Sequence, residues 1–147
     1  MKLLIRPATQ QDFSVLHRFI SELEEKPLDP VTFRAIYLRN LSDPRIHYLV
    51  AESDGQVVGF VSCHVQYLLH HVGKVGEIQE LFVKPEFRNQ QVGRQLVEAV
   101  EALARQERWV NLEVTTNQRR NDTHRFYQNL TFKQSHYKFV KPLQKAD

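Results

Sequence analysis

The sequence predicts an α/β domain in which helices flank a mixed central sheet, in the element order βααβββαβαβ. Residues 46–53 and 56–67 are rich in Val, Tyr, Phe and Ile, and Asp54-Gly55 between them is a strong hairpin signal. Residues 91–105 place apolar side chains at helical spacing on one face. Strand-like and helix-like segments alternate along the chain, which is typical of a layered α/β domain.

The N-terminal part predicts one short strand, residues 2–6, followed by two helices. Thr9 with Asp12 is a helix start signal, and Pro27 should end the first helix. Asp29-Pro30 supplies a cap and a first-turn proline for the second. The residues of this second helix that we expect to face inward are Phe33, Ile36, Tyr37 and Leu41.

The C-terminal half predicts the remaining elements. We expect a strand over residues 72–83 that ends before Pro85, then the helix over 91–105. A strand over residues 109–116 and a short helix over residues 122–129 follow. A last strand is expected over residues 132–140.

The length of 147 residues fits a single domain, residues 1–147. No apolar run approaches the roughly 18 residues that span a bilayer, so we expect no membrane partner and a cytoplasmic location. Cys63 is the one cysteine, which excludes an intrachain disulfide, and we expect it to be a small buried apolar side chain.

Positive charge collects near the C-terminus, where residues 118–147 hold seven Lys/Arg and two acids. Such a surface favours anionic partners, either nucleic acid or a cofactor or substrate that carries phosphate. The side chains of Arg119, Arg120 and Arg125 would suit phosphate oxygens, and a solvated basic face is the alternative. The composition does not choose between these interpretations.

The passage from the strand at residues 77–83 into the helix at Arg88–Gly93 is the strongest functional signal. A helix start offers unpaired N–H groups and the positive end of the helix dipole, so a pyrophosphate would bind there. Helices follow strands in every α/β protein, so the pattern alone is also explained by the fold.

This passage, Leu81-x-Val83-x-Pro85-x-x-Arg88-x-x-x-x-Gly93, resembles the cofactor motif of the GCN5-related N-acetyltransferase (GNAT) family. The resemblance implies a GNAT-like fold and acetyl-CoA as cosubstrate. Asn89 and Gln91 stand where the family has glycines, and we expect a helical backbone to accommodate them. The cofactor-binding residues that the resemblance implies are Leu81, Phe82, Val83, Arg88, Asn89, Gln91, Val92, Gly93, Arg94 and Arg120.

The segment Thr123-His124-Arg125-Phe126-Tyr127 followed by Thr131-Phe132 resembles a second family motif. The resemblance makes Glu77 the general base that deprotonates the amine, Tyr127 the general acid for the leaving thiolate, and the backbone of residues 81–83 the oxyanion donor. Glu80 is the second candidate base. By simple alternation it points away from Glu77 unless a bulge intervenes.

Several stretches outside the cofactor motif resemble the aminoalkylphosphonate N-acetyltransferases of this family: residues 6–10, 69–72, 76–81, 124–127 and 134–136. They imply a small-molecule amine acceptor that carries phosphonate or phosphate. They also imply a divalent metal, with His64, His70, His71 or His136 as ligands or as phosphonate contacts. Adjacent strand residues point to opposite faces, so we do not expect His70 and His71 to ligate one ion together.

Other functions stay open. In one alternative the chain acetylates another amine, namely a polyamine, an aminoglycoside, or a protein lysine or N-terminus. A non-catalytic acyl-CoA-binding module and a nucleic-acid binder are further alternatives, although no zinc-finger, RRM or P-loop pattern supports nucleic acid. An exposed final strand would also favour a homodimer.

Overall fold

The computed structural model describes residues 2–116 and 120–144. Contacts within the chain define two compact units, residues 1–115 and residues 116–147, and each is described by itself. That residues 1–147 form one domain stays a prediction.

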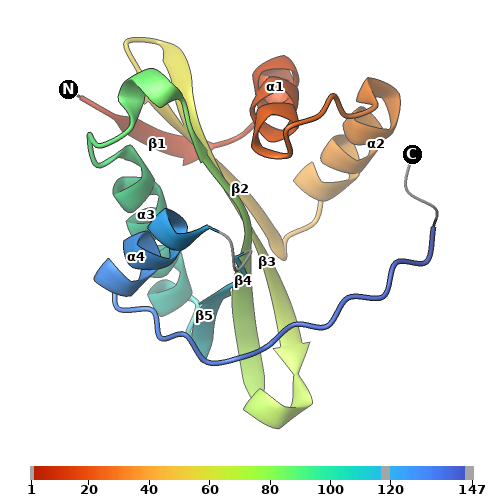
Figure 1. The fold of residues 1–147 in the computed structure, drawn as a ribbon, viewed down its shortest axis with the longest axis vertical. Coiled ribbons are helices and arrows are strands. Elements are labelled where there is room, and N and C mark those ends of the chain that lie inside the picture. The colour runs from red at the N-terminus through yellow and green to blue at the C-terminus, as the bar shows by residue number, and fades with distance from the viewer. Residues whose placement is uncertain (1, 117–119, 145–147) are drawn as a thin grey trace. The chain divides into compact units, whose positions relative to one another are not determined.

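The first unit contains a five-stranded sheet in the order β1-β2-β3-β4-β5 (Figure 1). Neighbouring strands are antiparallel except β4 and β5, which are parallel, so the predicted mixed sheet is confirmed. The strands are β1 Leu4–Pro7, β2 Ile46–Ser53, β3 Gln56–Leu68, β4 Gly73–Val83 and β5 Asn111–Val114.

Helices cover both faces of this sheet (Figure 1). They are α1 Phe13–Leu23, α2 Pro30–Leu41 and α3 Val92–Gln106, and short 3-10 turns lie at η1 Gln10–Asp12, η2 Leu69–His71 and η3 Pro85–Phe87. A Cβ on Gly59 would come within 3.1 Å of Leu96, so α3 packs directly on one face. On the other face Phe82 packs on Phe19 of α1, with ring centroids 4.7 Å apart.

The predicted turn and cap chemistry is confirmed. Asp54 and Gly55 have φ of 50° and 77°, as a tight hairpin requires. Asp29 caps α2 by accepting a hydrogen bond from the Thr32 N–H at 2.8 Å. The expectation that Ile36 faces inward is wrong, since its side chain is 55% exposed. The buried residues of α2 are Tyr37 and Asn40.

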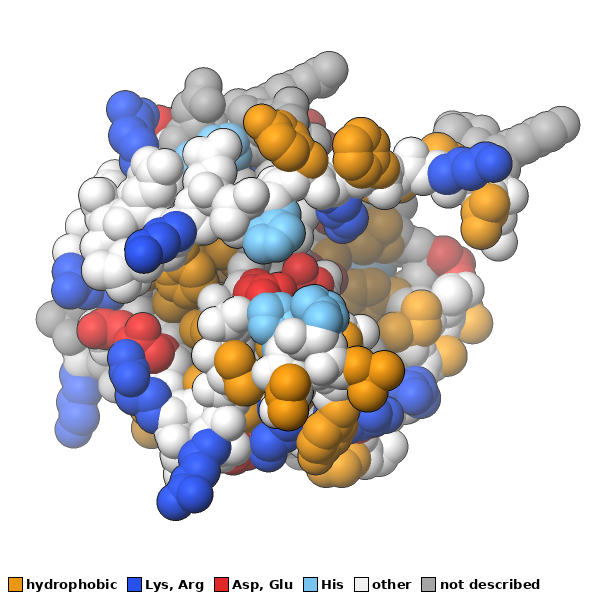
Figure 2. Space-filling view, turned by 90° about the horizontal axis from the view of Figure 1, so that it is seen from below, with side chains coloured by type: hydrophobic (Ala, Val, Ile, Leu, Met, Phe, Trp, Pro, Cys, Tyr) orange, Lys and Arg blue, Asp and Glu red, His pale blue; other side chains and the backbone are white. Residues whose placement is uncertain are grey.

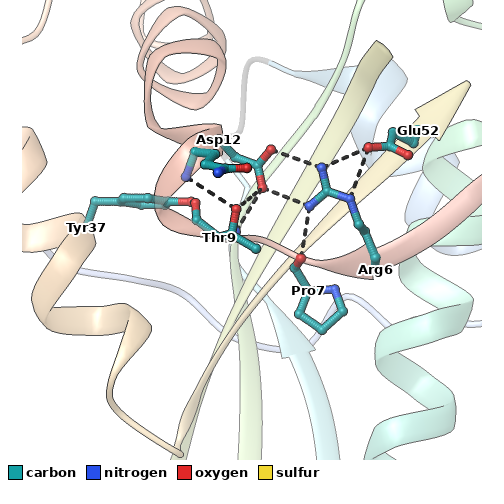
Figure 3. A network of polar contacts seen from close by, with 7 residues as sticks. Arg6, Pro7, Thr9, Asp12, Tyr37 and Glu52 are labelled. Atoms are coloured by element: carbon teal, nitrogen blue, oxygen red, sulfur yellow. Dashed lines mark hydrogen bonds and ion pairs between the residues drawn. The ribbon is translucent and has the colours of Figure 1, made fainter. Parts of the chain in front are cut away.

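Arg6 joins β1, η1 and β2 through two carboxylates (Figure 3). Its guanidinium donates to both oxygens of Asp12, at 2.8 and 3.0 Å, and to Glu52 at 2.9 Å. Asp12 also accepts the Thr9 N–H at 2.8 Å, which completes a capping box at the predicted helix start. The hydroxyl of Tyr37 donates to the Thr9 carbonyl, so the network also anchors α2.

We expect Asp12→Asn to lower the free energy of unfolding at pH 7 by about 2–3 kcal/mol, because it removes charged hydrogen bonds from a nearly buried carboxylate. Hydrogen bonds from Arg6 hold the pKa of Asp12 below its usual value. The ionised carboxylate therefore stabilises the fold above the unfolded-state pKa, and this contribution is lost as the pH falls through the lower folded-state pKa. Urea unfolding at pH 7 and pH 3 should show the gap between variant and wild type narrowing in acid. Glu22→Gln on exposed α1 surface is the charge-matched control, and an equal loss at both pH values would contradict the assignment.

The described part of the second unit contains α4, Asn121–Asn129, which confirms the predicted short helix. The strand predicted over residues 132–140 is wrong, since residues 132–144 form no strand in the structure. Tyr137, Phe139 and Leu143 are exposed there. Apolar alternation favours a strand only where a neighbouring strand supplies the hydrogen-bonding ladder, and no described strand pairs with this segment.

Candidate active site

The loop after β4 delivers free backbone N–H groups to the start of α3. The first hydrogen bond of this helix start runs from the Gln95 N–H to the Gln91 carbonyl at 3.0 Å. The N–H groups of Val92, Gly93 and Arg94 precede it and have no carbonyl partner within the helix. Together with the helix dipole they fit an anionic pyrophosphate.

The backbone at the two glycine replacements differs from expectation. Asn89 and Gln91 have φ of 62° and 69°, so both lie in the left-handed region and neither is helical. Gln91 is the residue that caps α3, and its side chain makes no cap hydrogen bond. A glycine-rich loop shape is therefore retained without the glycines, at a steric cost that falls mainly on Gln91, since Asn tolerates this region better.

We expect Gln91→Gly to raise the free energy of unfolding by about 0.5–1 kcal/mol, because relief of the left-handed Cβ clash outweighs the entropy of an added glycine. Urea unfolding measures the change. Gln91→Ala is the matched control: it keeps the Cβ and should stay within about 0.5 kcal/mol of wild type. A Gly variant less stable than the Ala variant would contradict the argument.

Arg88 folds back over the end of β4. Its Nε donates to the Val83 carbonyl at 3.0 Å, and its guanidinium lies 5.7 Å from the centre of the Phe82 ring. The side chains of Phe82 and Val92 are buried in the core, so only their backbone is available to a ligand. Arg94 is exposed and pairs with Glu98.

A bulge in β4 decides where the two candidate bases point. Glu77 is the register partner of His64, and Glu80 is the partner of Ser62, with the register shifting between Ser62 and Cys63. Because His64 and Ser62 are two residues apart, they face the same side of β3, and so do their partners. Glu77 and Glu80 therefore share the face covered by α1 and α2, and simple alternation is overruled.

Glu77 is held by two neutral donors. Gln79 donates to one carboxylate oxygen at 2.8 Å, and the Thr115 hydroxyl donates to the other at 3.1 Å. Each oxygen keeps unused acceptor capacity, since a carboxylate oxygen accepts about two hydrogen bonds. As far as the described residues go, Glu77 is thus oriented and keeps acceptor capacity for a further donor.

Glu80 is bound more tightly to its neighbour strand. The buried Ser62 hydroxyl donates to its carboxylate, and the Glu80 N–H donates back to the Ser62 oxygen at 3.0 Å. Glu80 also lines a cavity of about 290 Å³ between the sheet and helices α1 and α2, together with Tyr37, Tyr48 and Phe60. The carboxylate stands at one wall of an aromatic cavity.

The strands β4 and β5 pair only as far as Ile78 and Val114. Beyond the bulge, β4 continues to Val83 with no described strand on its β5 side. The backbone of residues 81–83, where the oxyanion donor is expected, lies in this unpaired stretch. The side chain of Leu81 faces α3, since its register partner Val61 shares the face of Gly59.

Tyr127 lies in the second unit, on α4. It is buried, with ring contacts to Phe126 and Phe132 at 5.1 and 5.4 Å, and burial raises its pKa to about 12. The phenol therefore keeps its proton at neutral pH. Arg120 directly precedes α4 and is exposed.

Of the basic residues expected to bind phosphate near α4, the structure describes Arg120 and Arg125. Arg125 is exposed and pairs with Asp122, so its charge is partly compensated. Arg119 lies outside the described residues.

The histidines named for a metal come from β3, from η2 and from the segment after α4. Within residues 2–116 and 120–144, no group of three or more His, Cys, Asp or Glu side chains has metal-binding geometry. His70 and His71 lie in η2 rather than in a strand, and their ring centroids are 4.4 Å apart. The expectation that they point to opposite faces of a strand was therefore wrong. His64 is on β3, and His136 contacts Ser135. The implied divalent metal therefore stays a prediction.

Sequence reasoning missed three polar residues at this site. Ser62 anchors Glu80, Thr115 orients Glu77, and Glu113 is the β5 register partner of Glu77. Ser62 carried a signal, as a polar side chain inside an apolar strand. Glu113 and Thr115 become site residues only through the β4–β5 pairing.

Cys63 is buried, as expected, and burial raises the pKa of its thiol to about 12. Among the described residues no helix has the length and apolarity to cross a membrane.

Comparison with known sequences agrees with this geometry. The model of the acetyltransferase (GNAT) family matches residues 10–132. An aminoalkylphosphonate N-acetyltransferase of Salmonella typhimurium is 44% identical over 139 residues, which cover 95% of this chain and 90% of that protein. An uncharacterized N-acetyltransferase of Archaeoglobus fulgidus is 48% identical over 59 residues, 40% of each chain.

Solved structures share the fold. A transcriptional regulator from Bacillus halodurans superposes with a TM-score of 0.90 at 23% identity, covering 97% of this chain and 100% of that one. An aminoglycoside N-acetyltransferase in complex with CoA superposes with a TM-score of 0.86 at 18% identity, covering 97% and 96%. These likenesses confirm the expected α/β architecture.

Proposed function

Since this chain belongs to the GNAT family of N-acetyltransferases, we propose that it transfers the acetyl group of acetyl-CoA to the primary amine of an aminoalkylphosphonate. The observation that carries the acceptor class is the 44% identity, along 95% of the chain, to a relative with that named activity. The free N–H groups at the start of α3 support the cosubstrate, because they suit the pyrophosphate of CoA.

Glu77 removes the proton that blocks the amine. A primary alkylamine has a pKa near 10.4, so it is mostly protonated at neutral pH and has no lone pair to attack with. The carboxylate of Glu77, oriented by Gln79 and Thr115, accepts this proton directly or through one water. The neutral amine nitrogen then attacks the thioester carbonyl carbon.

Attack places negative charge on the thioester oxygen, which a backbone N–H of residues 81–83 stabilises. The carbon–sulfur bond then breaks, and Tyr127 gives its phenolic proton to the departing thiolate. The phenol is protonated at neutral pH, and because burial raises the pKa of Tyr127 to about 12 it gives up the proton only as negative charge develops on the sulfur. The nitrogen, which became positively charged on attack, loses its second proton to water as the amide forms, and the tyrosinate is reprotonated from water.

Acetyl transfer is tested by mixing purified protein with acetyl-CoA and 2-aminoethylphosphonate while free thiol release is followed. Mass spectrometry should find the N-acetylated product, and an amine-free mixture controls for hydrolysis. Matched reactions contain a polyamine, an aminoglycoside and a lysine peptide. Faster turnover with one of these than with any aminoalkylphosphonate would overturn the acceptor class and keep the family chemistry.

A further inference from the structure

Glu113 lies beside the proposed base. On β5 it is the register partner of Glu77 on β4, and Glu77 is in turn the partner of His64 on β3. Register partners face the same side of a sheet, so these three side chains form one row on the face of α1 and α2. Adjacent strands are about 4.8 Å apart, which lets both carboxylates reach a single small group.

The carboxylate of Glu113 is only partly satisfied. Its side chain is 39% exposed, and Nε2 of His71 lies 3.7 Å from Oε2, beyond hydrogen-bond distance. Within the part of the chain that the structure describes, no side chain donates a hydrogen bond to it. Seen from the end of the sheet where η2 lies, acidic side chains gather next to histidines (Figure 2). Glu77, in contrast, accepts one donor on each oxygen.

Two carboxylates at directly opposed positions destabilise a sheet unless a cation lies between them. An ammonium is such a cation, and its three N–H donors match the open acceptor positions of the pair. Among the described residues no Lys or Arg contacts Glu77 or Glu113. His71 lies 3.7 Å from Glu113 but pairs with that carboxylate alone, so the described chain places no cation between the two carboxylates.

We propose that Glu113 binds the protonated amine of the acceptor together with Glu77. The inference rests on the proposed function. It specifies that the acceptor amine binds as an ammonium ion, before it loses a proton. Glu77 then takes one proton, and Glu113 stays ionised and holds a remaining N–H of the nucleophile. Amines that are neutral at the working pH gain less from Glu113, because they donate a neutral rather than a charged hydrogen bond to it.

Binding of two matched ligands at pH 7 tests this assignment, with calorimetry in the absence of acetyl-CoA. The first ligand is 2-aminoethylphosphonate, which is an ammonium at this pH, and the second is its O-alkylhydroxylamine analogue, which is neutral. Glu113→Gln should weaken the ammonium ligand by about 10- to 100-fold, as expected for loss of a charged hydrogen bond. The neutral analogue should lose less than about threefold, because its hydrogen bond to Glu113 carries no positive charge. In turnover, KM for the ammonium acceptor should rise while kcat changes less than about threefold, because uniform binding is lost.

Glu25→Gln, at an exposed position after α1, removes the same charge and should leave both affinities unchanged. Unfolding midpoints of both variants show that they fold. Equal weakening of the two ligands, or none, would overturn the role of Glu113 and leave the proposed acetyl transfer standing. Failure of wild type to acetylate any aminoalkylphosphonate, with the ammonium preference intact, would overturn the acceptor class alone.

Discussion

Glu77→Gln should lower kcat at pH 7 by about 10²- to 10⁴-fold, the range expected for loss of a positioned general base. The amide keeps the size of the side chain and still accepts one hydrogen bond, so folding and the KM for acetyl-CoA should change little. Steady-state kinetics with acetyl-CoA and 2-aminoethylphosphonate measures both quantities.

The pH dependence of kcat distinguishes the loss of a general base from a structural disturbance of the site. Without Glu77, only amine that is already neutral reacts, and that fraction rises about tenfold per pH unit below a pKa near 10.4. The deficit of the variant should therefore shrink steadily between pH 7 and pH 10. A deficit that stays constant with pH would point to a purely structural role.

Glu80→Gln is the matched comparison, because Glu80 faces the same side of the sheet. Its carboxylate is bound by Ser62, so the variant should retain more activity than Glu77→Gln. If Glu80→Gln were the more damaging change, and the Glu77 variant nearly wild type, the base would be Glu80.

Tyr127→Phe should lower kcat by about 10²-fold, the lower end expected for loss of a general acid. The ring contacts with Phe126 and Phe132 are preserved, so packing of the second unit should survive. Because the pKa of Tyr127 is raised to about 12, its loss should also leave the shape of the pH profile below pH 10 unchanged.

Tyr137→Phe is the control for this prediction. It also removes one phenolic hydroxyl, but from a side chain that is 83% exposed. Near-UV circular dichroism and the thermal midpoint report on folding of both variants. Activity within about threefold of wild type for a folded Tyr127→Phe would remove the tyrosine from the mechanism.

Local chemistry made most of the fold predictable. The hairpin at Asp54-Gly55 and the caps at Thr9 and Asp29 use side chains that act on their own neighbouring backbone, so the sequence alone locates them. The strand predicted at residues 132–140 failed because pairing needs a partner that no local pattern supplies.

The sequence by itself predicted the chemistry of the site. Arg88 and Gly93 flank the start of α3, whose backbone N–H groups would suit an anion, and this role remains a prediction. Glu77 was the first-ranked base on the resemblance alone, and that role remains a prediction.

The tertiary structure alone decided which side chains face one another. The β4 bulge turned Glu80 onto the side of Glu77, and strand pairing brought Glu113 beside it. Both depend on register, where one inserted residue reverses every later side chain, and register is set by strands far apart in the sequence. Backbone conformation at Asn89 and Gln91 was likewise invisible in the sequence, because left-handed geometry without glycine is imposed by the surrounding fold.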